Sequence, residues 1–156
     1  MATEQKNDPA ETDANRPRLG AIPFLVREGR IVLLLVTSTQ LGRWIFPKGA
    51  AQKTESHAET CRREAREEAG VDGEVLLDFP IKAAVRKTEG TVRRDVPVIF
   101  YPLAVADIHD KWPEGGRRLR HWVLLEEAEI LTEDEDTRRI LTAFRKVLPA
   151  IRSGAG

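Results

Sequence analysis

The sequence predicts a mixed β-sheet with helices packed on it, and three observations support this fold. The chain has 156 residues, of which 41% are hydrophobic, and this suits one domain with a sizeable core. Runs of aliphatic and β-branched residues alternate along the chain with two segments of helical spacing. No apolar run reaches the length of a membrane-spanning helix, so no membrane association is expected.

The strand signals begin with two runs, residues 21–26 and 31–36, that meet at a turn containing Gly29. The second run is rich in Val, Leu and Ile on both faces, so both of its faces are expected to be buried. In the run 92–105, two prolines are expected to confine the strand to an edge of the sheet or to break it. The other strand-type runs are residues 44–46, 75–77, 81–85 and 119–125.

The last element is predicted to be a helix. Thr132 and Glu135 form a possible capping box at its start. Apolar residues then recur at helical spacing, and Pro149 lies where the helix should end. We therefore expect one domain at residues 18–150, between an N-terminal disordered tail (1–17) and a flexible C-terminal tail (151–156).

The segment GAAQKTESHAETCRREAREEAGV, residues 49–71, is highly charged and also has helical spacing. Ser56 and Glu59 form a capping-box signature, and Gly70 suits the C-terminal cap. On a helical projection, a stripe of small apolar residues would face a sheet, and a second group of charged residues would face solvent. The stripe is Ala58, Cys61, Ala65 and Ala69, and the solvent-facing group is Glu59, Arg62 and Arg66.

Three carboxylates of this helix, Glu64, Glu67 and Glu68, have the spacing i, i+3, i+4 and can converge on one point. Converging carboxylates repel each other and raise each other's pKa. A hard divalent cation such as Mg²⁺ or Mn²⁺, which prefers oxygen ligands, would remove that repulsion. Taken alone, the same letters also fit a solvated helix laced with Glu–Arg pairs.

The whole segment resembles the Nudix box, the signature of the Nudix hydrolases. Every fixed position of that pattern is matched, by Gly49, Glu55, Arg63, Glu64, Glu67, Glu68 and Gly70. The small Ala65 at an apolar position is the one soft point. The resemblance implies an α+β fold, an α/β/α sandwich in which helices flank a mixed sheet and the box forms a loop–helix–loop.

The resemblance also implies roles for these residues. Glu67 and Glu68 match the principal metal ligands, and the carbonyl of Gly49 matches a further ligand. Glu64 matches a carboxylate that binds metal or acts as the general base. Arg63 and Glu55 match a structural pair that supports the loop and orients the catalytic carboxylates. The implied cofactor is Mg²⁺, with Mn²⁺ as a possible substitute, and the implied reaction is hydrolysis of a phosphoanhydride by a metal-activated water.

The flanks of the box are similar to the diadenosine and diphosphoinositol polyphosphate phosphohydrolase branch, in which basic residues surround a small-molecule polyphosphate. Lys48, directly before the box, could reach a phosphate. Arg118 and Arg120 share strand parity and should project from one face, whereas Arg93 and Arg94 should point oppositely. The matching positions are Arg18, Arg93, Arg94, Arg118 and Arg120, although each of them alone also fits a solvated surface residue.

Other functions stay open. An RNA 5′ pyrophosphohydrolase, an ADP-ribose or nucleotide-sugar pyrophosphatase, and a non-catalytic Nudix-like nucleotide-sensing module are the alternatives. The 25 basic and 25 acidic residues give zero formal net charge, which argues against an extended nucleic-acid surface. The single cysteine, Cys61, cannot form an internal disulfide, so a reducing, cytoplasmic location is expected. Family resemblance implies a monomer or a homodimer.

Overall fold

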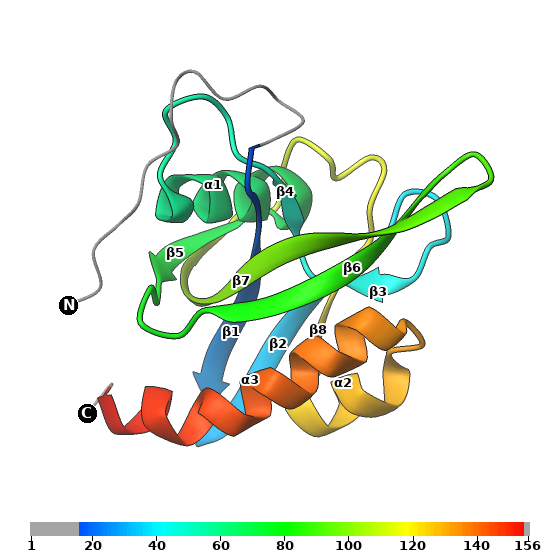
Figure 1. Cartoon of the computed structure of the whole chain (residues 1–156). Coiled ribbons are helices and arrows are strands. Elements are labelled where there is room, and N and C mark those ends of the chain that lie inside the picture. Colours follow the sequence, from blue (N-terminus) through cyan, green and yellow to red (C-terminus); the bar gives the residue numbers. More distant parts are fainter. Residues whose placement is uncertain (1–15, 155–156) are drawn as a thin grey trace.

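The computed structural model describes residues 16–154 (Figure 1), so most of the expected N-terminal tail and residues 155 and 156 lie outside the described residues. The elements, in chain order, are β1 (Arg18–Arg27), β2 (Arg30–Thr37), β3 (Trp44–Ile45), β4 (Lys48–Ala50), α1 (His57–Glu64), a π-helical stretch η2 (Ala65–Ala69), β5 (Val71–Val75), β6 (Ile81–Glu89), β7 (Val92–Ile108), β8 (Arg120–Leu124), α2 (Leu125–Leu131) and α3 (Glu135–Gly154). Within residues 16–154, no helix is both long and apolar enough to cross a membrane.

The sheet is mixed, as the sequence predicts. Its central path runs β3-β2-β1-β7-β5, with β4 paired to β1, β6 to β7 and β8 to β2. β1 and β7 are parallel, whereas the other strand pairs within the described residues are antiparallel. The pairing of β4 with β1 places Gly49 opposite Leu19. This register brings the start of the charged segment beside the centre of the sheet.

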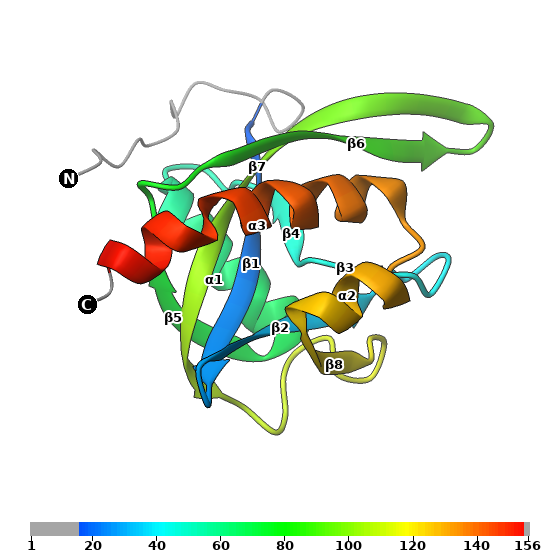
Figure 2. The same cartoon turned by 90° about the horizontal axis from the view of Figure 1, so that it is seen from below.

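Helices cover both faces of the sheet and complete a three-layer sandwich. α1 and η2 lie on one face, and α2 and α3 lie on the other (Figures 1 and 2). The alternation along β2 shows both layers, because Leu33 and Leu35 join the core under α3, whereas Leu34 and Val36 join the core under α1. The prediction that this strand is buried on both faces is confirmed.

The prediction for the proline-containing strand is partly wrong. β7 is unbroken over 17 residues and from Val98 to Ala104 lies inside the sheet, with β1 on one side and β6, then β5, on the other, whereas residues 92–97, which include Pro97, pair with β6 alone and form an edge as expected. Pro97 comes one residue before pairing with β1 begins, and Pro102 lies between the end of pairing with β6 and the start of pairing with β5. The missing N–H groups therefore fall where the ladder is incomplete. β5 also begins earlier than expected, directly after Gly70.

The C-terminal region differs from the expectation in three ways. A short helix, α2, precedes the long one, and Thr132 caps its C-terminus. The N-terminus of α3 is capped by Asp134, whose carboxylate accepts from the N–H and hydroxyl of Thr137. α3 continues through Pro149 to Gly154, so the expected flexible tail is helical over residues 151–154. Burial of Ile151 against the sheet offsets the backbone hydrogen bond that the proline removes.

Candidate functional site

The carboxylate-bearing helix begins and ends where the sequence predicts. The Ser56 hydroxyl accepts from the Glu59 N–H at 3.1 Å, and the Glu59 carboxylate accepts from the Ser56 N–H at 3.3 Å, which completes the capping box. Gly70 ends the helix in the left-handed conformation, with φ of 68°. The change to π-helical geometry at Ala65 was not predicted. Such stretches are frequent at functional sites because they re-aim side chains.

The small apolar stripe presses the helix onto the sheet. Cys61, Ala65 and Ala69 are fully buried, whereas Ala58 is only half-buried. The thiol of Cys61 contacts the carbonyl of Gly20 in β1 at 3.2 Å. Since the stripe has no bulky side chain, the backbone of the helix lies close to β1 and β4. This close packing carries the neighbouring carboxylates to the loop that contains Gly49.

Glu64 and Glu68 meet on the buried side of the helix, at 8% and 5% exposure. The carboxylate of Glu64 lies against the main chain of Gly49, where an added Cβ would collide with it. Glu68 accepts from the N–H of Lys48 at 3.3 Å. In β4, Lys48 thus contacts the carboxylate of Glu68, and Gly49 contacts the carboxylate of Glu64. A residue without a side chain is needed at position 49 for this approach.

Arg63 organises the acidic residues around it. Its Nε and Nη2 donate to the carboxylate of Glu55 at 2.7 and 3.0 Å, and its Nη2 also donates to the carbonyl of Ala50 at 3.0 Å. Its Nη1 donates to Glu64 at 2.7 Å and to Glu67 at 3.4 Å. One guanidinium group therefore connects the loop before the helix to two of the predicted metal ligands, which is the supporting arrangement that the resemblance implies.

The donor set suits a hard divalent cation. Burial, followed by the hydrogen bond and charge of Glu64, raises the pKa of Glu68 far above its usual value. Ionising both Glu64 and Glu68 is unfavourable because their negative charges repel each other. Such an oxygen-rich pair is stabilised by a divalent cation such as Mg²⁺. As they stand, the side chains of residues 16–154 form no set of three or more His, Cys, Asp or Glu groups arranged to hold a metal. Glu67 is instead turned toward Arg63 and is half-exposed.

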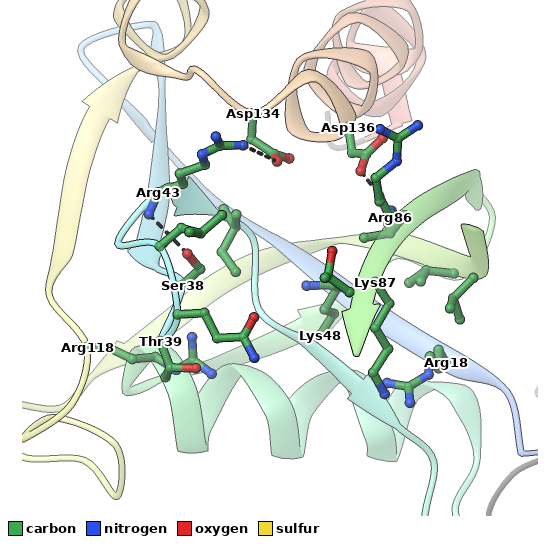
Figure 3. A pocket seen from close by; sticks show the side chains of 17 residues that line it. Arg18, Ser38, Thr39, Arg43, Lys48, Arg86, Lys87, Arg118, Asp134 and Asp136 are labelled. Carbon is green, nitrogen blue, oxygen red and sulfur yellow. Dashed lines mark hydrogen bonds and ion pairs between the residues drawn. The ribbon is translucent and has the colours of Figure 1, made fainter. Parts of the chain in front are cut away.

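A cavity of about 350 Å³ opens beside the carboxylate cluster, which is formed by Glu64, Glu67 and Glu68. Figure 3 shows it between the N-terminal end of α3, the loop after β2 and the base of the β6–β7 hairpin. Basic side chains dominate its polar lining, and no aromatic side chain among the described residues lines it. The lining residues that carry charge are Arg18, Arg43, Lys48, Arg86, Lys87, Arg118, Asp134 and Asp136.

Lys48 joins the cavity to the carboxylates. Its N–H holds Glu68, and its side chain lines the cavity. Burial lowers the pKa of Lys48, and the charges of Arg118 and Arg18 act in the same direction, whereas Glu68 and Asp134 oppose them. Several cations are therefore close enough to disfavour each other's charge. An anionic ligand would relieve that repulsion.

The predicted substrate residues separate into two groups. Arg18, Lys48 and Arg118 line the cavity, but Arg118 is nearly buried and donates to Glu114 at 2.7 Å and to the carbonyl of Thr37 at 2.8 Å. Arg118 also lies 3.8 Å from Glu68, so it supports the carboxylate cluster. The guanidinium group of Arg118 therefore contacts three protein groups, namely Glu114, the carbonyl of Thr37 and Glu68.

Arg93, Arg94 and Arg120 do not line the cavity. Arg120 is held elsewhere, with its guanidinium group 4.0 Å from the ring centre of Trp112 and a hydrogen bond to the carbonyl of Ala69. Arg118 lies just before β8 and not within it, but both arginines reach η2, Arg118 at Glu68 and Arg120 at the carbonyl of Ala69, so they project from one face as expected. Arg93 and Arg94 lie near the tip of the β6–β7 hairpin.

Sequence reasoning missed five charged residues of the cavity: Arg43, Arg86, Lys87, Asp134 and Asp136. Asp134 and Asp136 come from the start of α3, and the N–H of Arg86 donates to Asp136 at 2.9 Å, which ties the hairpin to that helix. The Arg-Lys pair in β6 was a detectable basic signal. The two aspartates gave no signal of their own, because their place at the cavity depends on how α3 packs on the sheet.

The NUDIX domain family matches residues 14–144 of the chain. Nudix hydrolase 4 of Arabidopsis thaliana is 31% identical over 137 residues, which are 83% of this chain and 65% of that protein. The chain thus spans less than two thirds of that relative's length. The asymmetrical bis(5′-nucleosyl)-tetraphosphatase of Sus scrofa is 32% identical over 112 residues, which are 70% of this chain and 74% of that protein.

Solved structures share the fold. An Ap4A hydrolase binary complex from C. elegans superimposes with a TM-score of 0.66 at 19% identity and covers 86% of this chain and 98% of that one. The NUDIX domain of NrtR from Shewanella oneidensis, solved with ADP ribose, gives a TM-score of 0.62 at 20% identity over 91% of this chain and 94% of that one. At these identities the likeness concerns the architecture alone.

Proposed function

The chain belongs to the Nudix family, and from this premise we propose that it is a Mg²⁺-dependent hydrolase of a phosphoanhydride bond in dinucleoside polyphosphates or diphosphoinositol polyphosphates. The observation that carries the proposal is the position of Lys48. Its backbone holds Glu68 of the carboxylate cluster, while its side chain lines the basic cavity. A diphosphate bound there would have its anionic groups beside both the cations and the carboxylates.

The residues divide the chemical work among them. Glu67, Glu68 and the carbonyl of Gly49 would hold Mg²⁺, which when bound neutralises and orients the phosphates. Glu64 is the proposed general base, because its carboxylate lies against Gly49 and is oriented by Arg63 at 2.7 Å. Arg63 positions Glu64 and Glu67 and is itself fixed by Glu55. Arg18 and Lys48 would bind phosphate oxygens of the substrate.

Two observations bear on the choice of substrate. The relative from Sus scrofa is named a bis(5′-nucleosyl)-tetraphosphatase, which supports a dinucleoside polyphosphate. The lining of the cavity supports a diphosphoinositol polyphosphate, because within residues 16–154 six Arg and Lys residues contribute to it and no aromatic ring is present to stack on a base. ADP-ribose and 5′-triphosphorylated RNA remain the alternative substrates.

The proposal is tested by steady-state kinetics over diadenosine polyphosphates, diphosphoinositol polyphosphates, ADP-ribose and 5′-triphosphorylated RNA. We expect the highest kcat/KM on one of the first two classes and no turnover when EDTA removes divalent cations. Turnover of ADP-ribose or RNA above both classes would reject the proposed substrates. Tight binding of a nucleotide without any hydrolysis in Mg²⁺ would instead support the sensing module.

The proposal also includes the cellular location and the oligomeric state of the protein. We propose a cytoplasmic monomer or homodimer that acts on small molecules, since Cys61 is a buried free thiol and the formal net charge is zero. Several relatives carry mitochondrial or chloroplastic names, so fractionation of the native protein is the relevant measurement. Sedimentation equilibrium would give the oligomeric state.

A further inference from the structure

The loop that joins β7 to β8, residues 109–119, lies against the C-terminal end of η2 (Figure 1). The last carbonyl groups of a helix have no partner within the helix, and here the loop supplies partners. The carbonyl of Glu67 accepts from the N–H of Glu114 at 2.9 Å. The carbonyl of Glu68 accepts from Nε1 of Trp112 at 2.9 Å. The two residues whose carboxylates are proposed to hold Mg²⁺ are therefore also held through their backbone.

Arg120 holds the next carbonyl from β8. Its Nη1 donates to the carbonyl of Ala69 at 3.0 Å, and its guanidinium group lies 4.0 Å from the ring centre of Trp112. Both side chains lie so close to Gly70 that a Cβ there would come within 2.6 Å of Nη1 of Arg120 and 2.9 Å of Cβ of Trp112. Glycine at this position thus permits the close contact, in addition to the left-handed turn that ends the helix.

The hydrogen bonding within η2 does not by itself select one helical geometry. The N–H of Gly70 donates to the carbonyls of both Ala65 and Arg66, which correspond to a π-helical and an α-helical bond. A change from one geometry to the other would turn the side chains of Glu67 and Glu68 relative to the sheet. Contacts from outside the helix to the carbonyls of these two residues oppose such a change.

We propose that Trp112 and Arg120 are positioning residues that fix η2 in its π-helical geometry and thereby place the carboxylates of Glu67 and Glu68 for Mg²⁺. This inference rests on the proposed function and deepens it, since it assigns part of the metal binding to residues outside the helix. Within residues 16–154, neither Trp112 nor Arg120 lines the cavity, so both act through the helix and not on the substrate. Arg120, which the sequence assigned to substrate binding, takes a different role.

Binding of Mn²⁺, the expected substitute for Mg²⁺, tests the proposal without any substrate. Electron paramagnetic resonance measures free Mn²⁺ and gives its Kd for the full chain. Trp112→Phe keeps a ring beneath Arg120 but removes the N–H that holds the carbonyl of Glu68. Trp44→Phe is the matched control, because Trp44 is also half-buried but packs against the core under α3, on the opposite face of the sheet.

We expect Trp112→Phe to raise the Kd for Mn²⁺ about fivefold, the factor that one lost hydrogen bond corresponds to. The Mg²⁺ concentration for half-maximal rate should rise by a similar factor, while the KM of the substrate stays unchanged because the cavity is unaltered. Trp44→Phe should bind Mn²⁺ as wild type does. If Trp112→Phe lowered the melting temperature but left the Kd for Mn²⁺ unchanged, Trp112 would be merely structural and the proposal would be overturned.

Two substitutions of Arg120 separate positioning from substrate binding. Arg120→Met removes the donor to the carbonyl of Ala69, whereas Arg120→Lys keeps a donor and the charge. A positioning role predicts a higher Kd for Mn²⁺ in Arg120→Met, partial recovery in Arg120→Lys and an unchanged KM in both. A higher KM with an unchanged Kd for Mn²⁺ would return Arg120 to the substrate and overturn its role here.

The outcome is separable from that of the proposed function. Weaker Mn²⁺ binding by Trp112→Phe, in a protein that hydrolyses no substrate of the panel, would reject the function and leave the positioning role standing. Hydrolysis by the wild type, together with equal Mn²⁺ affinity in wild type and Trp112→Phe, would reject the positioning role alone. Wild-type protein that binds no Mn²⁺ would reject both.

Discussion

Arg63 and Glu55, eight residues apart, form a two-pronged ion pair, with Nε donating at 2.7 Å and Nη2 at 3.0 Å. Burial acts to raise the pKa of Glu55, but the hydrogen bonds from Arg63, Gln52 and Thr60 outweigh it, so its pKa is lowered. The same guanidinium group also holds Glu64. The pair thus links the stability of the loop to the orientation of the carboxylate that we propose as the general base.

Glu55→Gln should therefore destabilise the fold at neutral pH, by about 1–2 kcal/mol, because charge-assisted hydrogen bonds become neutral ones. A lowered carboxyl pKa stabilises the folded state above the unfolded pKa, and this contribution is lost as the pH falls through the folded pKa. Urea unfolding at pH 7 and at pH 3 measures the difference, which should shrink at the acidic value. A difference that is the same at both pH values would contradict the ion-pair account.

Glu67→Gln should lower turnover about 10²-fold or more and raise the Mg²⁺ concentration needed for half-maximal rate, since a ligand charge is removed. Its side chain is half-exposed, so the melting temperature should change little. The matched control is Glu74→Gln, an exposed position in β5. Near-normal turnover of Glu67→Gln, measured beside that control, would reject Glu67 as a ligand.

Gly49→Ala should reduce turnover at least tenfold, because the new Cβ collides with the carboxylate of Glu64 and displaces it. Gly116→Ala is the control, since a Cβ at Gly116 meets nothing within 4 Å. Initial rates at saturating Mg²⁺ compare the two variants. Equal rates would show that Glu64 tolerates displacement and would argue against its assignment as the base.

Arg118→Ala should destabilise the protein by about 2 kcal/mol, because the nearly buried guanidinium group ties Glu114 to the carbonyl of Thr37. Arg117→Ala should change stability by less than about 0.5 kcal/mol, since Arg117 is exposed and contacts the same Glu114 at 3.5 Å. Chemical denaturation gives both values. If Arg118→Ala left the free energy of unfolding unchanged, the contacts of Arg118 would not be structural, and Arg118 would again be a candidate for binding the substrate.

Ile151→Ala should cost about 2 kcal/mol, because the side chain beyond Pro149 is buried in the core under α3. Ile130→Ala removes the same atoms from an exposed position of α2 and should be close to neutral. Thermal unfolding of the two variants side by side tests whether the end of α3 belongs to the domain. Equal melting temperatures of the two variants would show that residues 151–154 do not contribute to the stability of the domain.

The carboxylate helix could be predicted closely from the sequence because its determinants are local. The capping box at Ser56, the terminal Gly70 and the small stripe around Cys61 all act within a few turns of one segment. The same reasoning failed at Pro149 and Pro102. There the local penalty of a proline is offset by partners that are distant in sequence, namely the core that receives Ile151 and the strands that flank β7.

The sequence by itself determined the family signature, the limits of the helix that carries Glu64, Glu67 and Glu68, and the alternation that buries β2 on both faces. Only the tertiary structure decided which basic residues share a cavity, separating Arg18 and Lys48 from Arg120 and adding Lys87. The physical reason is that backbone periodicity fixes the direction of a side chain within its own element. Strand register and helix packing, which join segments distant along the chain, fix what that side chain faces.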